Sequence, residues 1–178
     1  MLIIFIAGCT PREIVSVGVE IVKEQVREEA KIREEIGNRY EKAIEVEPEE
    51  EIERELHKFL RPIFASIFGG AKLIDITYTD LPAFGIKAFV PLLTYILPRL
   101  VSEEDITKIK ASIEDKGYII KKYESIEGSI LLVFGQNGDP LFGVSATINA
   151  QEILAGGSLS KTYIELLFFD DFEDYGLG

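Results

Sequence analysis

Residues 10–46 contain the feature that most limits the shape of this chain, a long segment with the pattern of one amphipathic helix. Thr10 is a good N-cap, Pro11 suits the first helical position, and Glu13 completes a capping box. After this start, valines recur with heptad-like spacing at Val15, Val19, Val22 and Val26. The pattern therefore predicts a helix with an apolar stripe along one side.

The predicted length of this helix is too great for a compact body. A helix unbroken over residues 11–46 would be about 54 Å long, whereas a compact chain of this size has a radius of gyration of about 16 Å. We therefore expect either that Gly37-Asn38 ends the helix or that the helix protrudes and pairs with another copy of the chain. The i,i+4 pairs Glu29–Arg33 and Glu35–Arg39 are expected on its solvated side. Residues 15–21 also alternate apolar with polar, so a strand is the competing interpretation there.

The apolar residues 2–7 predict a buried strand that leads through a glycine turn into this helix. Gly8 and Thr10 are the candidate ligand-binding residues, because backbone N–H groups at a helix N-terminus can surround an anion. One glycine does not make a nucleotide-binding motif, so a capped helix packed on a strand is the preferred interpretation. Residues 6–9 also have the order of a lipoprotein cleavage and lipidation box, but the apolar run is short and no basic residue precedes it.

A second helix is predicted to start at Pro48 and to end at Gly69-Gly70, with a kink at Pro62. Its apolar stripe is expected in the core. A strand over residues 71–79 follows. Asp75 and Asp80, on and after this strand, could share a ligand site with the Gly8 turn, although capping of the next turn is preferred.

Residues 83–101 form the most hydrophobic window of the chain. As a helix these residues would be long enough to span a membrane. Lys87, Pro91 and Pro98 interrupt the window, however, so the sequence predicts a buried, kinked helix, with membrane insertion as the alternative.

The pattern changes after residue 101 from helical to alternating. Ser102 is expected to cap a helix that ends at Gly117. Strands are then predicted at 118–124, 129–135, 140–149 and 161–169. Asn137-Gly138 predicts a tight hairpin between two of them. Residues 151–158 are expected to form a short helix or a loop.

Charge and composition disfavour several classes of function. The net charge of −12 opposes binding to nucleic acid or to an anionic membrane. Basic residues at Lys108, Lys110, Lys121 and Lys122 have acidic neighbours and are expected on a solvated surface. One cysteine, Cys9, and one histidine, His57, are too few for an ordinary zinc site or a Cys/His nucleophile pair, so no cofactor is expected. Abundant Glu, Lys and Ile, without Trp, are typical of heat-adapted proteins.

The C-terminal residues 168–178 interleave aromatic with acidic side chains. Such a segment can dock in a basic, apolar-lined groove of another protein, although a frayed strand end is the simpler interpretation. The candidate protein-interaction residues are Phe168, Phe169, Phe172 and Tyr175.

The sequence thus predicts an α+β protein in which long amphipathic helices pack on a mainly antiparallel sheet, with a C-terminal β-meander. Residues 1–178 are expected to be one folding unit, helix-rich over 1–101 and a helix plus meander over 102–178. The expected function is non-enzymatic protein interaction or assembly, with self-association into a homo-oligomer. A small-ligand or anion-binding protein or enzyme and a membrane-attached envelope module are the alternatives. A cytoplasmic location is expected, with the membrane or cell envelope as the alternative, and no residue pattern decides whether the chain is an enzyme.

Overall fold

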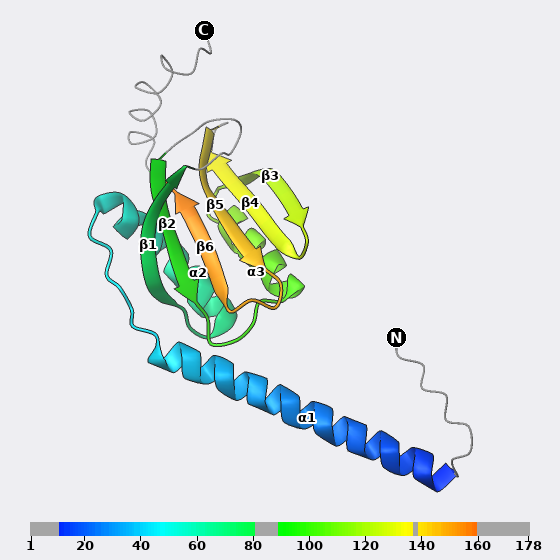
Figure 1. Ribbon diagram of the computed structural model, residues 1–178. Coiled ribbons are helices and arrows are strands. Elements are labelled where there is room, and N and C mark those ends of the chain that lie inside the picture. The colour runs from blue at the N-terminus through cyan, green and yellow to red at the C-terminus, as the bar shows by residue number, and fades with distance from the viewer. Residues whose placement is uncertain (1–10, 81–88, 137–138, 160–178) are drawn as a thin grey trace.

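The computed structural model describes residues 11–80, 89–136 and 139–159 (Figure 1). In chain order, the elements are α1 (Pro11–Lys42), α2 (Glu51–Phe68), β1 (Lys72–Asp80), β2 (Phe89–Ile96), α3 (Glu103–Glu114), β3 (Ile119–Ile126), β4 (Ser129–Gln136), β5 (Asp139–Thr147) and β6 (Glu152–Gly157). The predicted strands over residues 2–7 and 161–169 lie outside the described residues.

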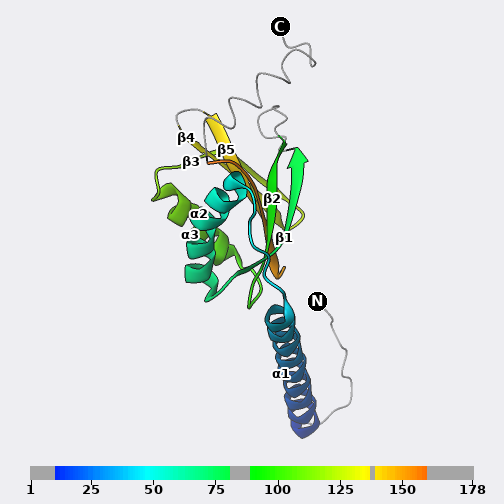
Figure 2. The ribbon, with the colours of Figure 1, turned by 90° about the vertical axis from the view of Figure 1, so that its left-hand side faces the viewer.

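The six strands form one antiparallel sheet in the order β1-β2-β6-β5-β4-β3. Helices α2 and α3 lie together on one face of this sheet (Figure 2). The core between the two layers contains large, fully buried side chains, among them Phe64, Tyr95, Phe134 and Phe142. The α+β class and the C-terminal meander, β3 to β6, are therefore as the sequence predicts.

The ends of the two body helices follow from local side-chain chemistry. Ser102 caps α3 as predicted, because its Oγ accepts a hydrogen bond from the Asp105 backbone N–H at 3.3 Å. The prediction that Pro48 starts α2 is wrong. Glu53 accepts hydrogen bonds from the backbone N–H groups of Glu49 and Glu50, so the capping box places the start at Glu51.

The prediction of a buried helix over residues 83–101 is also wrong, because Phe89–Ile96 is the strand β2. Leu93 and Tyr95, on alternate positions, enter the core with no exposed surface. Pro91 breaks a helix but is tolerated here. Pro91 lies opposite Tyr78 of β1, whereas pairing of β2 with β6 covers only residues 92–96, so on the β6 side the missing N–H of Pro91 interrupts no hydrogen bond.

Residues 151–158, predicted as a short helix or loop, contain strand β6 in the middle of the sheet. Alanine and glycine form strands poorly on their own. Here Ala155 and Gly156 are buried between β2 and β5, and both neighbours supply backbone partners. Tertiary pairing therefore overrides the local preference.

Helix α1 continues through Gly37 and Asn38 to Lys42, so these two residues do not end it. Residues 15–21 are helical, which excludes the competing strand. At 1.5 Å per residue its 32 residues span about 48 Å. The helix extends away from the body and leaves most of its length in solvent (Figures 1 and 2).

Candidate interaction surface

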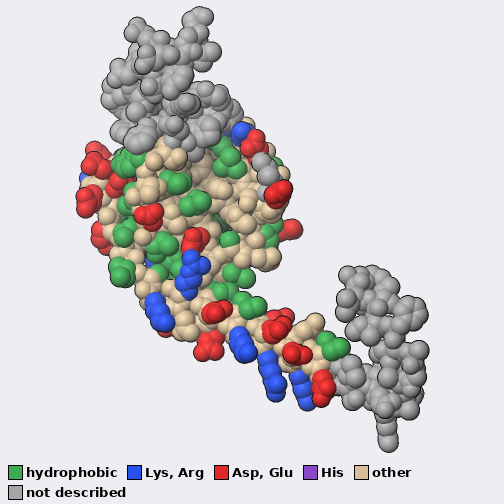
Figure 3. Space-filling view, viewed as in Figure 1, with side chains coloured by type: hydrophobic (Ala, Val, Ile, Leu, Met, Phe, Trp, Pro, Cys, Tyr) green, Lys and Arg blue, Asp and Glu red, His purple; other side chains and the backbone are tan. Residues whose placement is uncertain are grey.

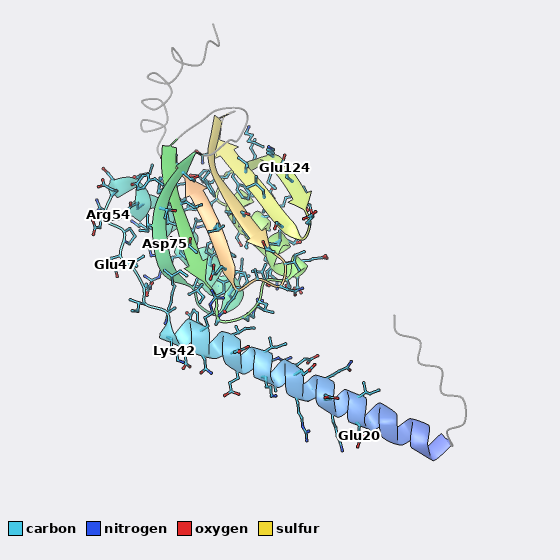
Figure 4. All side chains as sticks on the ribbon, in the orientation of Figure 1. Glu20, Lys42, Glu47, Arg54, Asp75 and Glu124 are labelled. Carbon is cyan, nitrogen blue, oxygen red and sulfur yellow. The ribbon has the colours of Figure 1, made fainter. Side chains whose placement is uncertain are left out.

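Helix α1 is attached to the body through its C-terminal turns alone, among the residues whose side chains are described. Every residue from 19 to 35 is exposed, whereas Ile36 and Tyr40 are half-buried. Figure 4 shows the two ends, with Glu20 far from the sheet and Lys42 beside it. The space-filling view shows charged side chains of both signs along the projecting part (Figure 3). We call the residues from 19 to 35 the arm.

Two polar side chains of the body fix the last turns of α1. The buried Gln151 uses its Nε2 to donate to the carbonyl oxygen of Ile36 at 2.8 Å and to that of Leu97 at 2.9 Å. Arg39 forms an ion pair with Glu152 at the start of β6. Because Gln151 joins α1 to the residue after β2, the direction of the arm is coupled to the sheet.

Lys72 at the start of β1 completes this attachment. Its Nζ donates to the carbonyl oxygens of Tyr40, Glu41 and Ala43 at 2.8, 3.2 and 3.1 Å. These carbonyls belong to the C-terminal end of the helix, where a positive charge also complements the helix dipole. Tyr40 lies close against Gly70, since a Cβ built on that glycine would be 2.6 Å from the tyrosine Oη.

The arm carries an apolar stripe that its own body does not cover. The exposed fractions of Val19, Val22 and Val26 are 47, 58 and 60%. Ile21 and Ile32 flank the stripe and are 45 and 50% exposed. Large aliphatic side chains at helical spacing normally contact another surface, and a contiguous exposed set marks a site of interaction.

Basic and acidic residues are mixed along α1. Helix α1 contains seven basic and eight acidic residues, a net charge of −1, whereas the whole chain has −12. Mixed charge of this kind allows ion pairs to form between the α1 helices of two copies.

A groove lies between the arm and the body. It consists of two adjoining hollows of about 790 and 680 Å³, which share Ile32, Ile36, Leu100 and Asn149 in their lining. Glu29 and Arg33 line the first hollow. Both residues are exposed, as predicted for the solvated side of the helix, and they continue the valine stripe toward the body.

The polar groups inside the body serve the fold. His57 Nδ1 lies 3.0 Å from the Tyr95 Oη, with the two rings stacked. Burial lowers the pKa of His57, assisted by the nearby Arg61 cation, and burial also raises the pKa of Tyr95. In the part of the chain that the structure describes, no buried side-chain nitrogen or oxygen lacks a hydrogen-bond partner. These polar side chains are thus satisfied within the body.

Carboxylates in the body are likewise held by neighbours. Burial alone would raise the pKa of Glu53, but the hydrogen bonds from Glu50, Glu49 and Tyr78 bring it below its ordinary value. Asp105 accepts two hydrogen bonds from the Arg99 guanidinium, at 2.6 and 2.8 Å, and these hold its pKa well below its usual range. Over residues 11–80, 89–136 and 139–159, no group of three or more His, Cys, Asp or Glu side chains could hold a metal ion.

The structure brings together only part of what the sequence predicts. The predicted ligand residues Gly8 and Thr10 lie outside the described residues, as do all four predicted interaction residues at 168, 169, 172 and 175. Asp75 is exposed on β1. Lys108 pairs with Glu104 and Lys122 with Glu124, at 2.7 and 2.9 Å, so two of the four basic residues are neutralised locally.

The groove residues Ile32, Ile36, Leu100 and Asn149 were not predicted as an interaction site. Their signal in the sequence is weak, because Leu100 and Asn149 come from connections far apart in the chain. Comparison with known protein families, with curated proteins and with solved structures gives no match. No helix among the described residues is both long and apolar enough to cross a lipid bilayer.

Proposed function

We propose that this chain is a non-enzymatic assembly protein that self-associates, and that α1 is its contact element. The observation that carries the proposal is an apolar stripe on a helix that, among the residues whose side chains are described, is held to its body through its C-terminal turns alone. An isolated helix in water gains little from its own backbone, and most helical stability in proteins comes from packing an apolar face. A second protein surface against the stripe supplies that packing.

The attachment of α1 supports the same function. The last turns of the helix are fixed to the start of β1 by Lys72, and to the start of β6 by Gln151 and by the ion pair of Arg39 with Glu152. A helix that served only as a flexible linker would need no such fixation. The fixed arm presents Val19, Val22 and Val26 at a defined distance from the sheet, which reduces the entropy lost on association.

The near-neutral charge of α1 favours a second copy of the chain as the partner. Seven basic and eight acidic residues on α1 allow two copies of the helix to approach with little net repulsion and to form ion pairs with each other. A basic partner protein would instead be expected to bind where the acidic residues are in excess.

Sedimentation equilibrium of the full-length chain at several concentrations tests this proposal. We expect a mass of twice 20.0 kDa at high concentration and a shift toward the single-chain mass on dilution. A mass that stays at 20.0 kDa up to hundreds of micromolar would overturn it.

A further inference from the structure

The distribution of charge along the stripe of α1 determines how two copies can pair. Continuing the spacing of Val22 and Val26 by steps of three and four leads to Glu29, Arg33 and Ile36. The stripe is thus apolar at each end and carries one acidic and one basic residue in the middle. Within the described part of the chain, neither Glu29 nor Arg33 has an ion-pair partner.

A parallel pair of helices would place identical residues of the stripe against each other. Glu29 would then face Glu29, and Arg33 would face Arg33, with repulsion in both layers. The bodies would also meet at the same end of the pair, where each already occupies the space beside its own Ile36 and Tyr40. Parallel pairing therefore conflicts with both the charge and the attachment of α1.

An antiparallel pair centred on Lys31 removes the repulsion between like charges and keeps the two bodies apart. Glu29 of each copy then lies against Arg33 of the other, which gives two ion pairs per dimer. In the same register Val26 lies against Ile36, which lines the groove, so apolar residues meet there. The two bodies lie at opposite ends of the helix pair.

The groove beside α1 provides space for the second helix. The lining residues Glu29, Arg33 and Ile36 belong to the stripe, and Leu100 and Asn149 form the opposite wall. In the antiparallel arrangement, the N-terminal half of the second helix lies along this wall of the first copy and points toward the body of the first copy. Its valines would then contact Leu100 as well as the stripe of the first helix.

We propose that two copies of the chain associate through antiparallel α1 helices, with Glu29 of each copy paired with Arg33 of the other. The part of each helix that contains Val22 and Val26 then lies in the groove of the other copy. This inference rests on the proposed self-association and specifies its geometry. It identifies the ligand of the groove as a second copy of this chain.

Charge reversal tests the register. In the antiparallel pair, E29R or R33E alone places like charges together in both central layers, so the dissociation constant should rise at least tenfold. The double variant E29R/R33E restores both ion pairs and should return the constant to within about threefold of the original. E24R and K31E make the same charge changes on the solvated side of the helix and serve as matched controls. Weakening by the single variants without rescue by the double variant would overturn the register.

Cysteine pairing tests the direction independently. In a Cys9→Ser chain, antiparallel pairing predicts that Val26→Cys mixed with Ile36→Cys forms an oxidised heterodimer, whereas Val26→Cys alone does not cross-link. A disulfide between two copies of Val26→Cys would show parallel helices and overturn this inference, while leaving self-association intact. A full-length chain that stays monomeric would instead remove the proposed function itself. A dimer without either cross-link, unaffected by the charge variants, would show that another surface associates.

Discussion

Shortening two valines of the arm should separate self-association from folding. We consider the double substitution Val22→Ala/Val26→Ala. Alanine has a higher helix propensity than valine, so the change does not weaken α1 as a helix. Neither side chain contributes to the buried core. The folded body should therefore be preserved while the contact surface between copies becomes smaller.

The magnitude follows from the exposure of the two side chains. Each Val→Ala change removes two methyl groups, worth roughly 0.8 kcal/mol each on full burial. Val22 and Val26 are 58 and 60% exposed in the single chain, so association recovers about six-tenths of that value. The loss is about 1 kcal/mol per valine, or about 4 kcal/mol for the four valines of a dimer. At 1.4 kcal/mol per factor of ten, the dissociation constant should rise on the order of a thousandfold.

Sedimentation equilibrium measures the dissociation constant of the original chain and that of the valine variant, and circular dichroism verifies that the helix content is unchanged. The matched control is Glu24→Ala/Lys31→Ala, which also creates two alanines in α1 and keeps its net charge, but on the side opposite the stripe. We expect the control to dimerise as the original chain does. If the valine variant dimerises within about threefold of the original chain, the stripe is not the contact surface and the reasoning from its exposure fails.

Three further predictions concern the body and the attachment of α1. Asp105→Ala removes the ion pair with Arg99 and half of the α3 capping box, so the free energy of unfolding should fall by ~1–2 kcal/mol. An unchanged midpoint of urea denaturation would contradict a stabilising role of Asp105. The pKa of His57 is lower in the folded state than its ordinary 6.5, so the stability contributed by its neutral form is complete above that pH and is lost as the pH falls below it. His57→Gln should therefore flatten the pH dependence of the free energy of unfolding just below pH 6.5, and a slope equal to that of the original chain would count against the effect of burial. Gly70→Ala should lower the free energy of unfolding by ~1–3 kcal/mol, because the added methyl group crowds the Tyr40 Oη. Adding Tyr40→Phe to the same chain should restore most of the lost stability, and failure of this rescue would show that the oxygen is not the obstacle.

Much of the fold can be predicted from local patterns because those patterns are strong. The capping residue Ser102 and the hairpin signal between β4 and β5 depend on a few neighbouring residues, and pairing of Gln136 with Asp139 confirms the hairpin. The stripe of α2 is recognised from its period alone. In such segments the local preference and the tertiary structure agree.

Strands β2 and β6 were missed because their conformation depends on neighbours distant in sequence. The window around Pro91 is uniformly apolar, and periodicity cannot distinguish a buried strand from a buried helix there. Ala155 and Gly156 have little strand preference and are held by β2 and β5 on both sides. No local signal reports such pairing.

The interaction surface, too, can be predicted only in part from the sequence. The valines of the arm can be found from their spacing, and the excessive length of the helix predicts that it protrudes. The groove requires Leu100 and Asn149 to approach Ile36, and this approach depends on the packing of Gln151 against α1. Only the three-dimensional arrangement shows that Glu29 and Arg33 lie on the groove side of the helix.

Hydrogen exchange of the full-length chain at two concentrations, one above and one below the dissociation constant, tests the central claim most directly. If α1 is the contact between copies, amides of residues 19–35 should exchange more slowly at the higher concentration, while those of the core strands β4 and β5 should be unchanged. Slower exchange confined to the sheet, or exchange in the arm that is the same at both concentrations, would contradict the account.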